Sequence, residues 1–544
     1  MPLLLKSGVT RARHLHVHAG PRNDDGPSAS FCRVLKMTIL KGIAAFFAGA
    51  APDVGKRPSD RTVVVSVLAA IVVIKASVLV LMGPMFQIDS TGYVEFADVI
   101  NRGFDWMRAS DPHQTGVASF RMIGYPAILA GAKVIFGDYF AWAVVAFQTA
   151  LSVFATALFF RAATAVTGSV RVAALLVIAY LLSPAFQYDL FILTDSIYGS
   201  LFTILTSVIL TAWAGRRPAS TGVALALGLL LAASFLIRET SLLFGMLFLP
   251  LILVWASIQG WRASVLAGLL FLLPPGMTWE GYRHWNEYRT GEMFITTGTG
   301  SALLYALASM DSLDRQLFAQ DTPVDNAVRD SRIPDAGASS AVFMLEAVAG
   351  LRILGDRYGM SGTDIERAVR TRYLRIVWSH PALIVRKMRQ ELMSDTLWGE
   401  INPARTVREL IWWREKGEFE GIRAFIARLA AERRASDIAF LPLEGFSRAA
   451  GAICWLAFLG TPIVAGFAFL RRRDQTGLLF LALFVPPAGV IAAYSMVHLE
   501  QRHLIGFIPA ILLCAIQTLR TLFSRRAVGD PGEPLTHYSH ASLS

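Results

Sequence analysis

The sequence predicts an all-α integral membrane protein, a bundle of about ten or more transmembrane helices. Of the 544 residues, 54% are hydrophobic and only 17% are charged, and the mean hydropathy is +0.49. A soluble protein of this length needs more charge to cover its surface. Apolar runs near ~20 residues, the length that crosses a bilayer as a helix, recur along the chain, and basic residues stand at their ends.

The chain begins with a polar region, residues 1–60, which we expect in the cytoplasm. Residues 1–36 are rich in Arg, His and Gly; they predict disorder and contain no evident cleavable signal peptide. Met37 is an alternative start. Residues 38–51 form a short amphipathic stretch that favours an interfacial position over a membrane span.

Ten apolar runs follow, each near the length of a membrane span. Their approximate limits are 62–82, 139–161, 170–187, 190–214, 220–237, 240–258, 263–283, 447–470, 477–497 and 502–523. These runs predict a transmembrane core over 61–285, with its first outer loop at 83–138. An outer region follows over 286–446, then C-terminal helices over 447–523 and a cytoplasmic tail over 524–544.

The basic residues between the spans fall on one side of the membrane. Taken in chain order, that side receives Lys56, Arg57, Arg61, Arg161, Arg171, Arg216, Arg217, Arg262, Arg471 to Arg473, Arg525 and Arg526. The positive-inside rule makes it the cytoplasmic side and leaves both termini inside. Because the net charge of +11 is scattered over loops, we do not expect nucleic-acid binding.

The first outer loop, 83–138, predicts two short helices at the membrane surface. Apolar residues recur at helical spacing after Asp89, from Tyr93 to Ile100. A second apolar stretch has Pro126 in its first turn and Gly137 at its end, positions that these residues favour. At about a dozen residues it is too short to span the membrane.

The outer region predicts helices at about 340–357 and 362–393 among irregular loops, without a separate globular enzyme domain. Trp398, Trp412 and Trp413 favour helices resting at the membrane interface. The sequence contains no P-loop, dinucleotide-binding fingerprint, metal-ligand spacing or nucleophile elbow, which argues against ATP-driven pumps and most soluble enzyme classes.

Titratable residues that topology does not explain gather on the outer side. They are Asp89, Arg121, Asp195, Arg238, Glu239, His284, Arg502 and His503. A polar cluster at one depth of one face predicts an external active site. Simpler interpretations stay open: Asp89 as the N-cap of the surface helix, and the arginines as side chains that reach toward lipid headgroups.

The order of these features resembles the GT-C superfamily of membrane glycosyltransferases, and most of all its protein O-mannosyltransferase and lipid A aminoarabinose transferase type. An acidic residue follows the first span, and an Arg-x-x-Gly-Tyr-Pro stretch begins at Arg121. Thr194-Asp195-Ser196, Arg238-Glu239-Thr240 and Glu500-Gln501-Arg502-His503-Leu504 follow. The resemblance covers roughly 60–285 and 447–523, and His503 stands where the family has Tyr.

The resemblance implies a polyprenyl-phosphate sugar as donor and transfer at the outer membrane face. It also implies that Asp89 acts on the acceptor. Many members carry two adjacent acidic residues at this position, whereas Ile88 and Ser90 flank Asp89 here. Some members bind a divalent metal in this pocket; with a single carboxylate aligned, we predict no metal site, although a divalent metal remains an option.

The chemistry of these residue types is consistent with that assignment. A carboxylate within hydrogen-bond reach can deprotonate an acceptor hydroxyl, which contributes ~10²–10⁴-fold, so we assign Asp89 as the general base of an inverting transfer. Arginines stabilise phosphate charge through paired hydrogen bonds, and Arg502, Arg238 and Arg121 are the candidates, in that order. Substrate binding is assigned to Glu239, Asp195, Tyr125 and His503. Two alternatives stay open: Asp195 and Glu239 as partners of the arginines, and His503, like His284, as a polar residue of the membrane interface.

The sequence thus favours a glycosyltransferase that modifies a lipid, glycan or protein of the cell envelope, in a bacterial inner membrane with its site in the periplasm. A transporter or flippase of lipid-linked sugars is the main alternative. It would need polar residues at mid-membrane and preferably an internal repeat; Lys75 is the one mid-span charge, and no repeat is apparent. A polysaccharide ligase or polymerase and a catalytically inactive scaffold are further alternatives.

Overall fold

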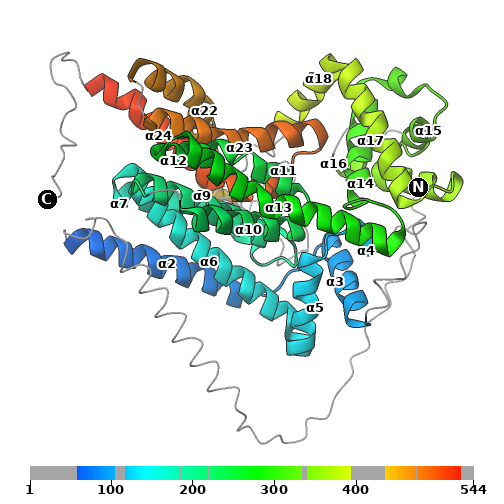
Figure 1. The fold of residues 1–544 in the computed structure, drawn as a ribbon, viewed down its shortest axis with the longest axis horizontal. Coiled ribbons are helices and arrows are strands. Elements are labelled where there is room, and N and C mark those ends of the chain that lie inside the picture. Colours follow the sequence, from blue (N-terminus) through cyan, green and yellow to red (C-terminus); the bar gives the residue numbers. More distant parts are fainter. Residues whose placement is uncertain are drawn as a thin grey trace, which may run out of the picture. The chain divides into compact units, whose positions relative to one another are not determined.

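The computed structural model describes residues 58–103, 117–183, 185–217, 220–333, 340–393, 435–472 and 475–527. Within them the regular elements are helices, apart from one isolated β-bridge between Met85 and Phe191. The predicted all-α membrane fold is therefore confirmed (Figure 1). The expectations for residues 1–36, 38–51 and Trp398, Trp412 and Trp413 lie outside the described residues.

Eight helical stretches in the described ranges are long and apolar enough to cross a membrane. They consist of α2 (Pro58–Met82), α5 (Gly124–Phe136) with η2 (Gly137–Tyr139) and α6 (Phe140–Thr167), α9 (Asp195–Ala214), α11 (Thr240–Met246) with α12 (Leu249–Ala256) and η3 (Ser257–Gln259), α13 (Trp261–Thr290), α22 (Ala435–Arg472), α23 (Gln475–Val497), and η7 (Ile505–Phe507) with α24 (Ile508–Ala527). A helix suits these apolar runs because it satisfies its own backbone hydrogen bonds without water.

Two of the ten predicted spans are shorter than a full crossing. Helix α7 (Val170–Leu181) has 12 residues and α10 (Thr221–Ile237) has 17, against the ~20 that a bilayer requires. The sequence predicted that the first of these spans extends from residue 170 to residue 187. Pro184 disfavours a continuous helix over that range, because it has no backbone N–H to donate. A separate turn, α8 (Ala185–Tyr188), follows instead.

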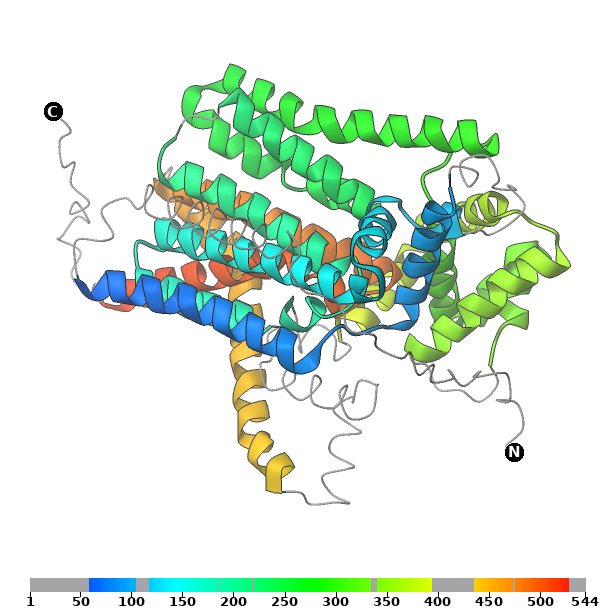
Figure 2. The same ribbon diagram turned by 90° about the horizontal axis from the view of Figure 1, so that it is seen from below.

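Both short helices nevertheless carry the chain from one end of the bundle to the other. The bridge from Met85 to Phe191 brings the segment after α7 to the end of α2 where the first outer loop begins. The ion pair between Arg238 and Asp195 joins the end of α10 to the start of α9. Figure 2 shows the first long helix of the bundle, α2, running beside α6.

The first outer loop contains the two short helices that the sequence predicted. Helix α3 (Ile88–Asn101) has 14 residues and packs against α5, which has 13. A four-residue turn, α4 (Val117–Phe120), precedes Arg121. Helix α5 ends at Gly137, whose φ of 54° favours glycine, and one 3-10 turn then leads into α6.

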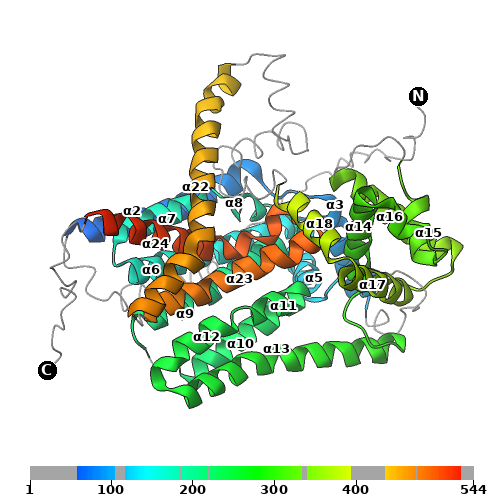
Figure 3. The ribbon, with the colours of Figure 1, turned by 90° about the horizontal axis from the view of Figure 1, so that it is seen from above.

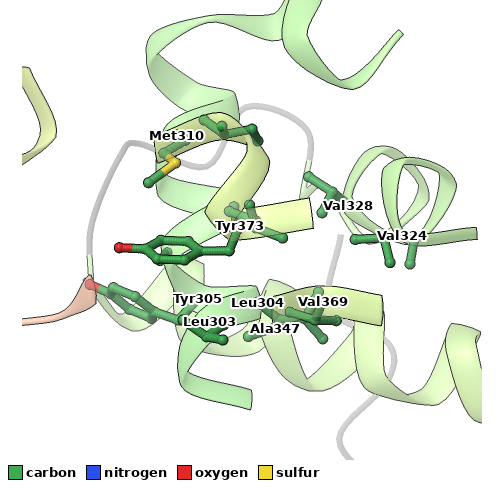
Figure 4. Close-up of a cluster of buried hydrophobic side chains, with 14 of the residues drawn as sticks. Leu303, Leu304, Tyr305, Met310, Val324, Val328, Ala347, Val369 and Tyr373 are labelled. Carbon is green, nitrogen blue, oxygen red and sulfur yellow. The ribbon is translucent and has the colours of Figure 1, made fainter. Parts of the chain in front are cut away.

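Residues 298–392, within the predicted outer region, form a helical layer with a hydrophobic core of its own. Its helices are α14 (Gly298–Leu313), η4 (Arg315–Phe318), α15 (Pro323–Asp330), α16 (Ser340–Arg352), η5 (Ile353–Arg357), α17 (Gly362–Ser379) and α18 (Pro381–Leu392). Leu304, Tyr305, Val369 and Tyr373 lie in this core (Figure 4). We call it the α14–α18 layer; it contacts α23 through α14 and α18 (Figure 3). Such a core was not expected from the sequence.

The sequence predicted one helix over 362–393, and this was wrong. The chain breaks at His380, which has φ −133° and ψ 58°, and Pro381 begins a new helix. Proline disfavours helical geometry at the residue before it and is well tolerated at the first helical position. The proposed domain divisions at 285/286 and 446/447 fall inside α13 and α22, respectively.

The mid-span charge, Lys75, is neutralised inside the bundle. Its ammonium donates to the Asp189 carboxylate at 2.5 Å and to the Ser152 hydroxyl at 2.9 Å. The Ser196 hydroxyl donates to the other Asp189 oxygen at 2.7 Å. Because a buried charge is costly unless it is paired, this pair explains how Lys75 is tolerated between apolar helices.

Candidate active site

Asp89 lies in the first turn of α3, but its side chain does not cap that helix. Gln87 occupies the N-cap position, and the backbone N–H of Gln87 donates to the Ser90 hydroxyl at 2.9 Å. The carboxylate of Asp89 is therefore left to interact beyond α3. The alternative interpretation of Asp89 as an N-cap does not hold in this structure.

Two arginines from distant parts of the chain contact Asp89. Arg121 Nη2 donates to Oδ1 at 3.0 Å, and Arg502 Nη1 donates to Oδ2 at 2.7 Å. Burial by itself would raise the pKa of Asp89, but the charges and hydrogen bonds of Arg502 and Arg121 outweigh it and lower the pKa. The Asp89 side chain is 32% exposed, so an ionised carboxylate remains accessible to solvent at this point.

Arg121 is held in place by aromatic rings. Its guanidinium lies 4.7 Å from the centre of the Tyr93 ring and 5.0 Å from that of Phe120. A further guanidinium nitrogen contacts the Tyr93 hydroxyl at 3.4 Å. Arginine stacks well on aromatic faces, and its planar group still has donors to spare. The Nε atom is buried and has no hydrogen-bond partner among the described residues.

Arg502 lies in the turn η6 (Gln501–His503) between α23 and α24, and it is shared between two carboxylates. Its Nη1 contacts Asp89, and its Nε forms an ion pair with Glu500 Oε2. Burial favours a raised pKa for Glu500, but Arg502 and His498 outweigh it and hold the pKa well below its usual value. The sequence prediction did not identify Glu500 as a site residue, although it stands in the motif around Arg502.

Arg238 and Asp195 form a second ion pair at the same end of the bundle. Arg238 Nη1 lies 2.6 Å from Asp195 Oδ1, and the guanidinium lies 5.2 Å from the centre of the Tyr198 ring. Asp195 is buried at the start of α9. Burial opposes the charge on Arg238, but Tyr494 and Asp195 outweigh it and raise its pKa. In this structure Asp195 thus serves as a partner of Arg238.

Glu239 differs from the other carboxylates of the site. It is half-buried at the start of α11, and none of the described residues forms a hydrogen bond or ion pair with its carboxylate. Burial opposes the charge on Arg121, but Tyr93, Asp89 and, to a smaller extent, Glu239 outweigh it and raise the pKa of Arg121. Gly124 packs tightly against the backbone of Leu236 and so brings the Arg121 loop against the Arg238–Glu239 turn.

Tyr125 and His503, both expected to bind substrate, are buried among protein groups. The Tyr125 hydroxyl donates to Gln148 Oε1 at 2.8 Å. The His503 ring stacks on Tyr494 with 3.6 Å between ring centres, and its Nδ1 accepts the backbone N–H of Glu500 at 3.1 Å. Burial and the charge of Arg238 keep the pKa of His503 well below its usual value. Their assignment to substrate binding stays a prediction.

The sequence prediction missed a group of charged residues that is connected to Arg502 through Glu500. His498 contacts Glu500, and Glu391 and Lys387 come from α18 in the outer region. The i, i+4 spacing of Lys387 and Glu391 is a weak signal, because it is also common on solvated helices. His284, by contrast, lies exposed on α13 and pairs with Glu287 at 3.1 Å.

The residues present do not suit a divalent metal at this site. The described part of the chain contains no group of three or more His, Cys, Asp or Glu side chains arranged to hold one. Both oxygens of Asp89 accept from guanidinium groups, so a cation bound there would meet two positive charges. The arrangement suits an anion better, because arginine donors remain to meet it.

Comparisons with known proteins give no close relative. No protein-family model matches the sequence, and no curated protein matches it. Two solved structures that align with the fold are of an oligosaccharyltransferase from Archaeoglobus fulgidus. One is the apo form, at 11% identity and a TM-score of 0.42. The other is tethered by a disulfide bond to an acceptor peptide containing the NVT sequon, at 11% identity and a TM-score of 0.43.

Each alignment covers 86% of this chain and 51% of the matched chain. This chain therefore spans about half the length of the oligosaccharyltransferase that it matches. Similarity at this level establishes neither a family nor an activity for the chain.

Proposed function

We propose that this protein is a membrane glycosyltransferase that transfers a sugar from a polyprenyl-phosphate donor to a hydroxyl of an envelope lipid, glycan or protein. The observation that carries the proposal is the contact of one accessible carboxylate, Asp89, with two arginines from opposite parts of the chain. A reaction of this kind needs a base for the acceptor and positive charge for a departing phosphate.

In the proposed reaction the acceptor oxygen bonds to the anomeric carbon of the sugar as the bond from that carbon to the phosphate oxygen breaks. The acceptor proton passes to Asp89, and the electron pair of the broken bond leaves on the polyprenyl phosphate. The attack comes from the face opposite the phosphate, so the configuration inverts. Arg121 and Arg502 keep guanidinium donors beyond those that contact Asp89, and these can receive the phosphate.

The same two arginines link phosphate binding to the basicity of Asp89. While they pair with the carboxylate they lower its pKa, which makes it a weak base. An incoming phosphate competes for both guanidinium groups and withdraws part of that stabilisation. The carboxylate thus becomes a stronger base when the donor is bound. Arg238 and Glu239, at the neighbouring turn, are placed to contact the sugar or the phosphate.

We place the site on the periplasmic side of a bacterial inner membrane. Arg217, which follows α9, and Arg262, in the first turn of α13, stand at helix ends opposite to the site. By the positive-inside rule that end faces the cytoplasm. The transporter alternative has no specific observation in its favour. Its mid-span charge, Lys75, is buried and hydrogen-bonded to Asp189 and Ser152 within the bundle.

The test is the substitution Asp89→Asn with Asp98→Asn as its matched control. Asp98 lies on the same helix and pairs with Lys133 at 2.5 Å, away from the arginines. We expect Asp89→Asn to reduce sugar transfer about 10²–10⁴-fold while the protein still inserts, and Asp98→Asn to retain transfer. The readout is mass spectrometry of envelope glycolipids and glycoproteins from cells with each variant.

Transfer retained in Asp89→Asn would rule Asp89 out as the base. Envelope glycans that are unchanged when the whole protein is removed would rule out the glycosyltransferase. A change confined to polysaccharide chain length or attachment would instead identify the ligase or polymerase alternative.

A further inference from the structure

His498 lies between two carboxylates in the short segment that connects α23 to η6. Its Nε2 is 2.7 Å from Glu500 Oε1, and its Nδ1 is 3.8 Å from Glu391 Oε2, which is ion-pair range but too long for a direct hydrogen bond. The imidazole ring lies 4.0 Å from the Tyr305 ring, centre to centre. Its side chain is only 13% exposed, so water contributes little to its stabilisation.

The two carboxylates connect His498 to different parts of the protein. Glu391 accepts from the Lys387 ammonium at 2.9 Å and from the backbone N–H of Leu499 at 3.2 Å, and both Glu391 and Lys387 belong to α18. Glu500 pairs through its other oxygen with Arg502, which contacts Asp89. The result is a continuous line of alternating charges from the α14–α18 layer to the candidate active site.

The charged and titratable groups that face His498 come from each element packed against it. They are Glu391 and Lys387 from α18, Tyr305 from α14, Glu500 from its own segment, and Arg502 and His503 from η6. The carboxylates are the nearest of these charges. Burial would lower the pKa of His498, but its contacts with Glu391 and Glu500 outweigh burial and raise it.

We propose that protonated His498 is a positioning residue that holds Glu500 between two cations and thereby keeps the Arg502 guanidinium directed at Asp89. When His498 loses its proton, Arg502 is the strong cationic partner that Glu500 keeps among the described residues. The pair between Glu500 and Arg502 then tightens at the expense of the pair between Arg502 and Asp89. The α14–α18 layer is coupled to the site by this route, because Glu391 holds the opposite side of the imidazole.

The first measurement needs no substrate and is independent of the proposed function. The full chain is purified in detergent, and its melting temperature is measured for Asp89→Asn, Arg502→Lys and the double variant. The non-additive part of the shift reports the interaction between positions 89 and 502. The cycle is repeated with His498→Gln, which keeps a hydrogen-bond donor but carries no charge, and with His284→Gln, an exposed His–Glu pair outside the site.

We expect a clear non-additive shift in the wild-type background at pH 6, a reduced one in the His498→Gln background, and a wild-type one in the His284→Gln background. A residue with a merely structural role would lower every melting temperature and leave the non-additive part unchanged. That result would overturn the proposal.

The second measurement rests on the proposed function. It also tests the role of His498 if one of the variants in the melting-temperature cycle fails to fold. A short-chain polyprenyl phosphoglucose is bound to the full chain from pH 5.5 to 8.5; it is a phosphodiester whose single charge is constant over this range. We expect the dissociation constant of the wild type to rise by about fivefold or more with increasing pH, as is typical of coupled sites, and that of His498→Gln to be flat.

Together, the two measurements distinguish a failure of the role proposed for His498 from a failure of the proposed donor. The same pH dependence in wild type and His498→Gln would overturn the role of His498 while the donor still binds. Absence of binding at every pH would count against the proposed donor, and the melting-temperature cycle would then decide on His498 alone.

Discussion

Gly124 controls how closely the Arg121 loop approaches the Arg238–Glu239 turn, and Gly124→Ala tests that arrangement. A Cβ atom at this position would lie 2.5 Å from the Leu236 carbonyl oxygen and 2.7 Å from its carbonyl carbon. Ordinary contact begins near 3.4 Å, and both neighbours are backbone atoms that cannot rotate away. The start of α5 or the turn after α10 must therefore move by roughly 1 Å.

Such a shift acts directly on the site, because Arg121 stands three residues before Gly124. A displacement of about 1 Å at a reacting centre can cost ~10²-fold in rate, and overpacking typically costs ~1–3 kcal/mol of stability. We expect Gly124→Ala to lower sugar transfer about 10²-fold with a modest fall in melting temperature. The assays are sugar transfer by the full-length protein in vesicles and thermal unfolding in detergent.

The matched control is Gly131→Ala on the same helix. No atom lies within 4 Å of a Cβ built at Gly131, and alanine favours a helix over glycine by ~1 kcal/mol. We expect this control to retain transfer and to melt at the same or a higher temperature. Equal activity in Gly124→Ala and Gly131→Ala would refute the reasoning that this contact sets the position of Arg121.

Three further predictions concern charge pairs. Lys75→Met should cost about 3–5 kcal/mol of stability, because it leaves Asp189 buried without its cation, and the double variant Lys75→Met/Asp189→Leu should recover most of that loss; thermal unfolding checks both. Lys133→Met, in the more exposed pair with Asp98, should cost no more than about 1 kcal/mol. Because the folded-state pKa of Asp89 lies below its ordinary value of 3.8, its pairing stabilises the protein above that value, and the stabilisation is lost as the pH falls through the folded-state pKa. The melting temperatures of wild type and Asp89→Asn should therefore differ at neutral pH and begin to converge only as the pH falls below 3.8 toward the folded-state pKa. A difference that keeps its neutral-pH value down to the lowest pH at which both proteins still fold would contradict this assignment.

The membrane fold was predictable because apolar runs and the residues at their ends are local properties of the sequence. Helices make up most of each of the ten predicted runs, and the helix between Pro126 and Gly137 ends where the glycine indicated. The errors came from local breaks. Pro381 divides a helix that was predicted as one, and α7 stops after 12 residues.

The site was predictable in part. The sequence singled out Asp89, Arg121 and Arg502 because charged residues are costly beside apolar runs, and the structure brings these three together. The sequence offered no reason to expect that Glu500, His498 and Glu391 form a chain of contacts from Arg502 to α18. Nor did it indicate that Tyr125 and His503 would be buried.

The sequence by itself determined that this is a membrane-spanning helical protein with its unexplained charges on one side, because hydrophobicity and charge act residue by residue. Only the tertiary structure decided which charges meet. Asp89 and Arg502 are separated by 413 positions along the chain, and their 2.7 Å contact depends on how α3 and the turn after α23 pack. A carboxylate that looked solitary in the sequence is thus held by two arginines, because the energy of an ion pair depends on distance in space and not on separation along the chain.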